Sequence, residues 1–321
     1  MKRLTYLLLV LFMIATSVFA GESKISGLTY FNYTYNSDDD AVNGFGLNRV
    51  YFTYQNEISE GIKYKFQTDI DYKSSPMNVY LKNAKIDWQT QYGKVTLGLQ
   101  GMNVFSIQEK TWGYRYIDKS PMDLHKWSSS ADMGIGYSNK LMDKLNFSIL
   151  YTNGAGYKKS ENDSNKKLSI QVSHGERKLV SKDGFNIGAI FTHEPYDFEV
   201  DTVKTILKKK TVLGLFAGFS GMGIRIGAEF DRMKDDGSDV TKQIGAIYGR
   251  YQLSDDIEVF GLYDLYDPNT DENDNNENYI IAGFSYSPGK GLIIAPNIRY
   301  ISYEDDTDSK TLYVVNIRFK F

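Results

Sequence analysis

The segment from Ile62 to Tyr72, IKYKFQTDIDY, alternates strictly between two kinds of residue. One set of alternate positions is apolar, aromatic or threonine: Ile62, Tyr64, Phe66, Thr68, Ile70 and Tyr72. The other set is polar and carries four charges: Lys63, Lys65, Gln67, Asp69 and Asp71. Because successive side chains of a β-strand point to opposite faces, this period predicts a strand with one apolar face and one charged face. A helical period of 3.6 residues would scatter both sets.

The same alternation recurs along the chain and continues to its last residue. There, alternate positions hold Tyr313, Val315, Ile317, Phe319 and Phe321. Sixteen such segments follow one another without a repeat unit or a linker, and we expect them to begin near residues 25, 45, 62, 78, 94, 131, 144, 167, 185, 211, 223, 243, 257, 279, 292 and 311. An even number of strands returns both ends of the chain to one side.

Short and long connections alternate between these segments. Seven connections are mostly tight, around Gly61, Gly93, Asp143, Met222, Asp256 and Gly291, with the stretch from Lys178 to Gly184 as the exception. The others are mostly longer and polar, as in Gly154 to Lys166 and Asp267 to Glu277. A transmembrane barrel has short periplasmic turns and longer outer loops, so this alternation favours an antiparallel all-β transmembrane barrel.

One residue conflicts with a regular barrel. Pro296 lies in the middle of the fifteenth segment. A closed barrel has no free edge on which a missing backbone N–H is harmless, so we expect a β-bulge or a bend at this proline.

The first twenty residues differ in composition from the rest. Lys2 and Arg3 precede a short apolar run that ends in Ser17, Val18, Phe19 and Ala20. We expect residues 1–20 to be a signal peptide for Sec export, and residues 21–321 to form one domain. The chain has no cysteine, which excludes a lipid-anchored lipoprotein and a disulfide-stapled domain. Its net charge of −3 offers no case for nucleic-acid binding.

The third long connection, from Met102 to Ser130, is rich in large apolar residues. These residues are Phe105, Ile107, Trp112, Tyr114, Tyr116, Met122 and Trp127. So many aromatic side chains are poorly suited to an exposed loop tip. We therefore expect this third outer loop to fold back into the barrel lumen.

These features resemble the bacterial outer-membrane porins of the general sixteen-stranded kind and, more loosely, the phosphate-selective porin O/P family. The residues that carry the resemblance are Glu109, Lys110, Trp112, Gly113, Tyr114 and Arg115 of the third loop, the late segment from Ala295 to Tyr300, and the terminal Phe321. The resemblance implies a bacterial outer-membrane protein surrounded by lipid, a third loop that narrows the channel, and a homotrimer. It also implies that Phe321 is the assembly signal that the outer-membrane assembly machinery reads in the C-terminal strand.

The lumen of a sixteen-stranded barrel is too wide for its own side chains to fill, so it holds water unless a loop plugs it. A charge that faces lipid at mid-depth costs about 2 to 4 kcal/mol, so charges mark the inward face of each strand. We expect the lumen wall to include Arg49, Lys63, Lys65, Asp69, Asp71, Lys85, Asp87, Arg225, Glu229, Arg250, Arg299 and Arg318, with Asp132, Asp231 and Asp264. Outward tyrosine and tryptophan residues fit interfacial girdles: Tyr72, Tyr151 and Tyr300 at one rim, and Trp88, Tyr251 and Tyr286 at the other.

The charges of the third loop are the candidate pore constriction: Glu109, Lys110, Arg115, Asp118, Lys119 and Asp123. Facing the wall, they would create a transverse electric field. Because positive and negative charges nearly balance, we expect a channel for passive diffusion of small hydrophilic solutes and ions with weak charge selectivity. An anion-preferring or phosphate-preferring porin is the alternative, although the mixed charges do not support phosphate specificity.

Three other functions are less well supported. A barrel hydrolase would need one of three histidines, of which His193 beside Glu194 is the best placed, ahead of His125 and His174, but no G-x-S-x-G elbow accompanies them. A plugged adhesive barrel would lack conductance. A soluble β-sandwich or propeller is disfavoured by the terminal Phe321, by the expected signal peptide and by the alternation of short and long connections. The acidic loop with Asp267, Asp271, Glu272 and Asp274 does not match an EF-hand, so we expect a solvated loop and no metal or other cofactor.

Overall fold

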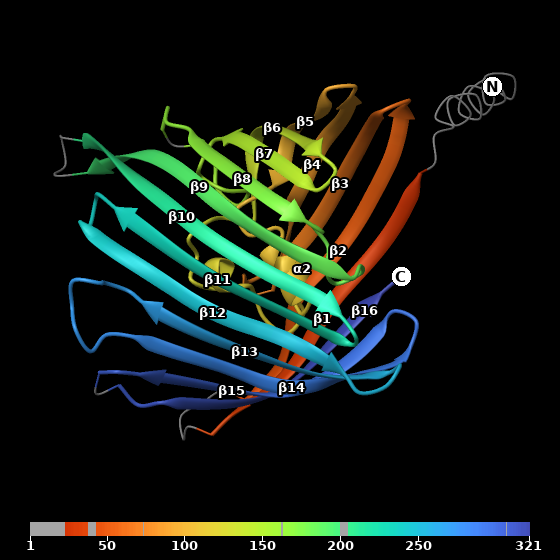
Figure 1. Cartoon of the computed structure of the whole chain (residues 1–321), viewed down its shortest axis with the longest axis vertical. Coiled ribbons are helices and arrows are strands. Elements are labelled where there is room, and N and C mark those ends of the chain that lie inside the picture. Colours follow the sequence, from red (N-terminus) through yellow and green to blue (C-terminus); the bar gives the residue numbers. More distant parts are fainter. Residues whose placement is uncertain (1–22, 38–42, 73, 162, 200–204, 306) are drawn as a thin grey trace, which may run out of the picture.

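The computed structural model describes residues 23–37, 43–72, 74–161, 163–199, 205–305 and 307–321. The predicted signal peptide, residues 1–20, and the predicted start of the mature chain at Gly21 lie outside these residues. Sixteen described strands form one closed antiparallel barrel in which neighbours along the chain are neighbours in the sheet (Figure 1). The predicted all-β, sixteen-stranded fold is confirmed.

The first eight strands are β1 (Lys24–Asn36), β2 (Gly44–Ser59), β3 (Ile62–Asp71), β4 (Asn78–Thr90), β5 (Gly93–Gly101), β6 (Ala131–Met142), β7 (Leu145–Thr152) and β8 (Lys167–Gly175). The second eight are β9 (Gly184–Glu199), β10 (Thr205–Gly221), β11 (Ile224–Asp235), β12 (Val240–Gln252), β13 (Ile257–Asp267), β14 (Glu277–Gly289), β15 (Leu292–Tyr303) and β16 (Lys310–Lys320). Two short helices, α2 (Gln108–Trp112) and α3 (Pro121–Leu124), lie between β5 and β6.

The barrel closes by pairing its first strand with its last. Leu28 of β1 lies opposite Lys320 of β16. Gly27 and Phe321 then exchange two backbone hydrogen bonds of 3.1 Å each, which extends the seam to the final residue. Closure gives the edge groups of β1 and β16 partners, as hydrocarbon requires of any strand that spans it.

The two faces of each strand differ in exposure as the alternation predicts. In β11, Arg225, Glu229 and Asp231 are buried, whereas Ile226 and Phe230 on the other face are about half exposed. In a soluble protein this order would be reversed. The apolar face is therefore the outer, lipid-facing surface, and the charged face is the lumen side.

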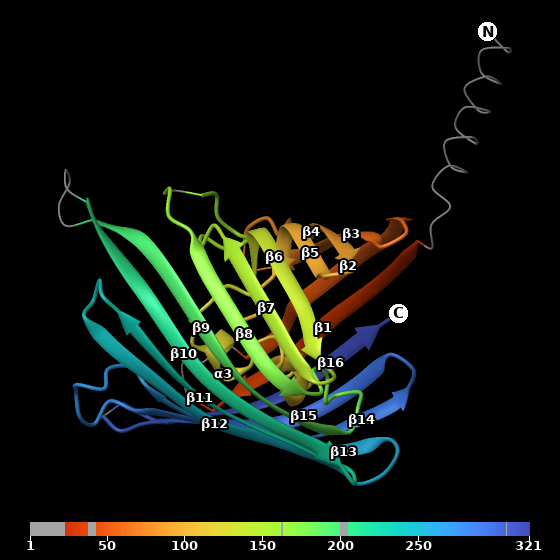
Figure 2. The same cartoon turned by 45° about the horizontal axis from the view of Figure 1, so that its top comes forward.

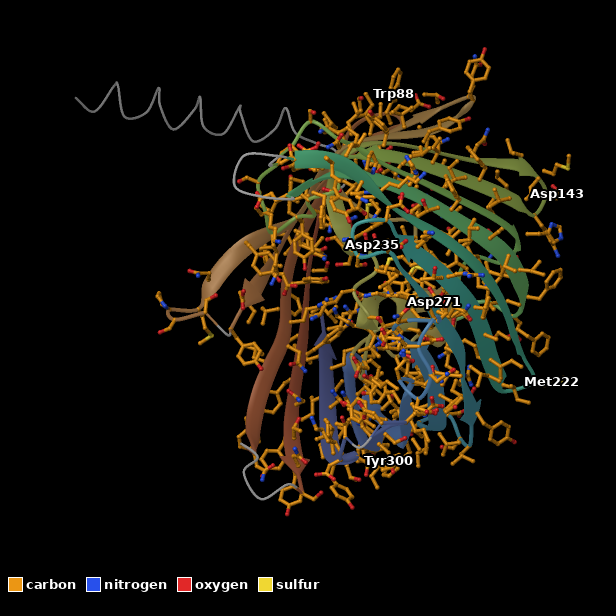
Figure 3. The ribbon with its side chains drawn as sticks, turned by 90° about the vertical axis from the view of Figure 1, so that its left-hand side faces the viewer. Trp88, Asp143, Met222, Asp235, Asp271 and Tyr300 are labelled. Carbon is orange, nitrogen blue, oxygen red and sulfur yellow. The ribbon has the colours of Figure 1, made fainter. Side chains whose placement is uncertain are left out.

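The predicted girdle residues are all exposed: Tyr72, Trp88, Tyr151, Tyr251, Tyr286 and Tyr300. Tyr72 lies just beyond the end of β3. Trp88 lies opposite Ile62 beside a short turn, as Tyr251 does opposite Ile224. In Figure 3, Met222, in the short turn before Ile224, and Asp143, in the turn between β6 and β7, lie at the same edge of the molecule.

The expectation of a bulge at Pro296 is wrong. Pro296 pairs in register with Val315 of β16. On its other side, the pairs Gly283↔Asn297 and Tyr286↔Ile294 share one register, and the shift between β14 and β15 lies instead between Tyr286 and Gly289. A proline lacks only one ladder hydrogen bond, and the neighbouring pairs hold the register.

Among the described residues, no helix is long and apolar enough to cross a membrane. The two short helices lie within the ring of strands, where α2 is visible in Figure 1 and α3 in Figure 2. The segment that contains them, residues 102–130, is called the inner segment below.

Candidate functional site: a passage between two unlike walls

The inner segment packs its large side chains away from water. Seven of them are 6% exposed or less: Phe105, Ile107, Trp112, Tyr114, Tyr116, Met122 and Trp127. They pack in two apolar clusters with inward residues of the barrel, including Val212 and Ile244 in one and Tyr248 and Phe260 in the other. Part of the inward face of the barrel is therefore a packed core and not a wetted wall.

Arg299 of β15 is the main charged anchor of this segment. One of its guanidinium nitrogens donates to Asp118 Oδ2 at 2.7 Å, and the other donates to the backbone oxygen of Ile117 at 2.7 Å. The Tyr279 hydroxyl also donates to Asp118 at 2.7 Å. A planar guanidinium suits this two-point contact, which fixes the segment to β14 and β15.

Further contacts extend the anchoring toward β11 and β13. Arg225 donates to the backbone oxygens of Thr111 and Trp112, at 2.7 and 3.1 Å, where α2 ends and its carbonyls lack helical partners. His125 Nε2 lies 2.8 Å from Asp264 Oδ2. We call the inward faces of β11 to β16 the covered wall, because the inner segment is bound to them.

Several predicted wall residues belong to this covered wall. Arg250 pairs with Glu258 at 3.4 Å, and Arg318 lies over the Tyr116 ring at 5.4 Å. Glu229 is buried beside Gln108, away from the passage. These side chains lie on the inward side of the barrel, where they contact the inner segment or one another.

The charges of the inner segment pair mostly among themselves. Arg115 contacts Glu109 at 2.6 Å and Asp123 at 2.8 Å, and Lys119 contacts Asp123 at 3.3 Å. Asp118 is the one predicted constriction residue with an ion pair to the wall in the described residues, through Arg299.

The inward faces of β2 to β5 form a second wall, which we call the open wall. Arg49 lies 3.8 Å from Asp69, and Asp87 lies 2.8 Å from Lys85 and 3.7 Å from Lys94. Two other predicted residues pair near the rims: Lys63 with Glu57 at 3.2 Å, and Asp71 with Lys158 at 3.6 Å.

A cavity of about 620 Å³ lies between the open wall and the inner segment. Its lining holds two carboxylates, Asp87 and Glu109, and nine cationic residues, namely Arg49, Lys65, Lys82, Lys85, Lys94, Lys110, Arg115, Arg177 and Lys178. The surplus of positive charge on this lining is the main electrostatic feature of the passage.

A second cavity, of about 340 Å³, shares Arg49, Arg115 and Ser130 with the first. It too is lined mainly by positive charge, with Lys119, Lys126, Lys158 and Lys159 beside a single carboxylate, Asp123. The positive lining thus continues past Arg49 and Arg115.

The sequence matches the model of one protein family, described as Gram-negative porin, over residues 7–307. The chain belongs to the Gram-negative porin family. It is therefore a channel protein of the bacterial outer membrane, and the expected porin fold and location are confirmed.

Solved structures similar to this porin are also porins or outer-membrane proteins. An anion-selective porin from Comamonas acidovorans has 14% identity and a TM-score of 0.73, with 94% of this chain and 100% of that chain covered. OmpF of Salmonella typhi has 13% identity and a TM-score of 0.69, with 94% and 98% covered. The trimer form of OmpT from Vibrio cholerae has 14% identity and a TM-score of 0.67, with 94% and 100% covered. No curated protein sequence matches the chain.

Sequence reasoning missed Lys82, which lies in the passage of the porin. The register between β3 and β4 shifts after Gln67↔Asn83, so that Thr68 lies opposite Leu81 and Lys82 has no partner. This bulge buries Lys82 and Asn83 together on the inward side. Strict alternation would turn Lys82 outward, so it could not identify this residue.

Sequence reasoning also missed three other cationic residues of the passage, for different reasons: Lys94, Arg177 and Lys178. Lys94 lies on the inward side of β5, where alternation could have found it. Arg177 and Lys178 lie in the turn between β8 and β9, where no alternation exists. The only hint was the unusual length of that turn.

The histidines offer no catalytic constellation among the described residues. His193 and Glu194 are consecutive residues of β9 and so point to opposite faces, and Glu194 pairs with Lys167 at 2.6 Å. His125 stacks on Tyr266 as well as contacting Asp264. In this part of the chain, no group of three or more His, Asp or Glu side chains is placed to hold a metal ion.

Proposed function

We propose that this porin is a passive diffusion channel whose open passage prefers small hydrophilic anions. The observation that carries the proposal is the lining of the larger cavity, where nine cationic residues face two carboxylates. A low-dielectric wall concentrates such a field, which raises the local concentration of anions and lowers that of cations. The polar lining favours solutes that keep their water.

The position of the acidic residues supports this preference. In the sequence, inward carboxylates are nearly as numerous as inward cations. In the structure, however, three of these carboxylates are buried on the covered wall: Glu229, Asp231 and Asp264. Asp118 is bound to Arg299. The weak selectivity predicted from the sequence assumes that every inward charge acts on the passage equally, and this placement argues against that assumption.

One of the similar structures is itself described as an anion-selective porin. We extend that property to this chain because of the charges on its open wall, and not because of a likeness that rests on 14% identity. The mixed wall, with Asp69 and Asp87 retained, supports a general anion preference and not phosphate specificity.

We further propose that the constriction lies beside the inner segment, where Lys110 and Arg115 face the open wall. The channel acts by passage alone, without catalysis, and assembles in lipid as a homotrimer, as in the trimer form of the similar OmpT. Residues 1–20 direct Sec export. Phe321, which is exposed beside Phe319, is the residue that the assembly machinery reads.

Reversal potential in a planar bilayer under a KCl gradient tests this proposal. We expect the sign of an anion-selective pore, with chloride several-fold more permeable than potassium, on the order of the enrichment that a focused surface field produces. A reversal potential near zero, or of the cation-selective sign, would contradict the proposal.

Lys65→Glu is the variant that reports on the open wall, because Lys65 lines the larger cavity. We expect it to reduce the chloride preference. The matched control is Lys290→Glu, which makes the same charge change at an exposed residue in the turn before β15. An equal shift in both variants would show that net charge, and not the passage lining, sets the selectivity.

A further inference from the structure

The connection between β8 and β9 is the one long turn on its side of the described barrel. It comprises residues 176–183, whereas the connections around Gly61, Gly93 and Met222 have two residues each. We call residues 176–183 the long turn. A diffusion channel needs no such extension, so its contacts indicate what it contributes.

The long turn folds inward and contacts the inner segment. The backbone N–H of Val180 donates to the backbone oxygen of Lys110 at 3.0 Å. Leu179 is 1% exposed, and both its side chain and that of Thr111 approach Gly218 of β10. The turn is thus anchored to α2 and to the wall.

This arrangement adds three cations to the lining of the larger cavity. Arg177 and Lys178 come from the long turn, and Lys110 comes from α2; all three line the cavity. No ion pair joins any of them to a carboxylate within the described ranges. The neighbouring acids have other partners, since Glu109 contacts Arg115 and Glu176 contacts Lys182 at 3.7 Å.

The neighbouring cations also affect Lys110. Burial, followed by the positive charges of Arg177 and Lys178, lowers the pKa of Lys110 to about 8, and Glu109 opposes this only in part. Lys94 of β5 adds to the repulsion. A bound anion would offset the repulsion that Arg177 and Lys178 exert on the buried ammonium of Lys110.

We propose that Lys110, Arg177 and Lys178 form a binding site for a small divalent oxyanion where the long turn meets the inner segment. The guanidinium of Arg177 offers a planar pair of donors that matches two oxygens, and the two lysines add point charges. Three unpaired cations favour a divalent over a monovalent anion. This proposal rests on the proposed anion preference of the same passage. It adds a position in the passage at which a divalent anion binds.

Sulfate is the probe, because it stays divalent across the pH range in which Lys110 titrates. Chloride current through the full mature protein in a planar bilayer is recorded while sulfate replaces a monovalent sulfonate at constant chloride and ionic strength. We expect sulfate to reduce the chloride current in a saturable way. In Lys178→Gln and in Arg177→Gln, the half-blocking concentration should rise roughly threefold to tenfold, as expected for a lost charge-assisted contact discounted for solvent.

Lys182→Gln is the matched control, since Lys182 lies in the same turn, is largely exposed and pairs with Glu176. It should leave the sulfate effect unchanged. Equal weakening in Lys182→Gln and Lys178→Gln, or a wild-type current that sulfate does not reduce, overturns the site. Reversal potentials from the same membranes separate this failure from that of the channel proposal: an anion-selective pore without a sulfate effect loses only the site, whereas a pore without anion preference loses both.

Discussion

The strands of the open wall and of the covered wall have the same alternating pattern, yet the charged side chains of the two walls have different roles. On the covered wall, Arg225 and Arg299 hold backbone oxygens and a carboxylate of the inner segment. On the open wall, Lys65 and Lys85 face a cavity. Inward charge is thus structural where the inner segment covers it and electrostatic where water reaches it. Substitutions on the two walls should therefore change different properties.

The largest effect is expected from Arg299→Met on the covered wall. It removes the ion pair with Asp118 and the hydrogen bond to Ile117, and leaves Asp118 with the Tyr279 hydroxyl and the backbone N–H of Lys119 as donors. We expect a loss of about 2 kcal/mol of stability, since the pair is mostly but not fully buried. The loosened segment should also make single-channel current noisier.

Heat modifiability on gels, together with single-channel recording, measures both changes. The control is Lys65→Met on the open wall, which also removes one inward cation. It should leave the temperature of unfolding unchanged and alter selectivity alone. If both variants unfold at the same temperature, the distinction between the two walls is wrong.

A smaller effect, on selectivity, is expected from Lys82→Met. Lys82 donates a hydrogen bond to Ser130 and lies 3.5 Å from the centre of the Tyr157 ring. Although Lys82 is buried and contacts the inner segment, it lines the larger cavity, so we expect its charge to act on the passage. We expect the ratio of chloride to potassium permeability to fall about twofold. Reversal potential measures this, and Lys82→Arg should restore the ratio; a variant with an unchanged ratio would remove Lys82 from the passage.

Alternation was sufficient to predict the barrel because hydrocarbon imposes it on every spanning strand. The predicted strand starts agree closely with the structure, except that β10 begins at Thr205 and not near residue 211. The stretch Lys208 to Lys210 breaks the alternation. Where a hairpin extends beyond the lipid, both faces meet water and the pattern disappears.

The site was less predictable because it depends on contacts distant in sequence. Alternation placed Arg49 and Arg299 on the inward face equally, but only the position of Asp118 determines that Arg299 is covered. Lys82 needed a bulge, and Arg177 needed a turn that folds inward. Neither the bulge nor the inward turn has a periodic sequence pattern. The sequence therefore predicted which charged side chains point inward, but not which of them are accessible to water.

A pH dependence of selectivity should arise from Lys110, at the border between the two walls. Its pKa is lowered to about 8 by burial and by Arg177 and Lys178. Lys110 is therefore charged below this pH and neutral above it. We expect a modest decrease in chloride preference as pH rises from 6.5 to 9.5. Reversal potentials at both values measure it, and a decrease that persists in Lys110→Met would have to come from another group.

The smallest effect is expected from Lys63→Gln at the rim of the open wall. Lys63 points inward by alternation, but its side chain is 64% exposed and its partner Glu57 is exposed as well. An exposed ion pair of this kind contributes less than about 1 kcal/mol and is screened by salt. Stability and reversal potential should both stay close to wild type. A shift as large as that of Lys82→Met would mean that the field extends to the rim, and that enclosure within the cavity is not what gives a lysine its influence on passing ions.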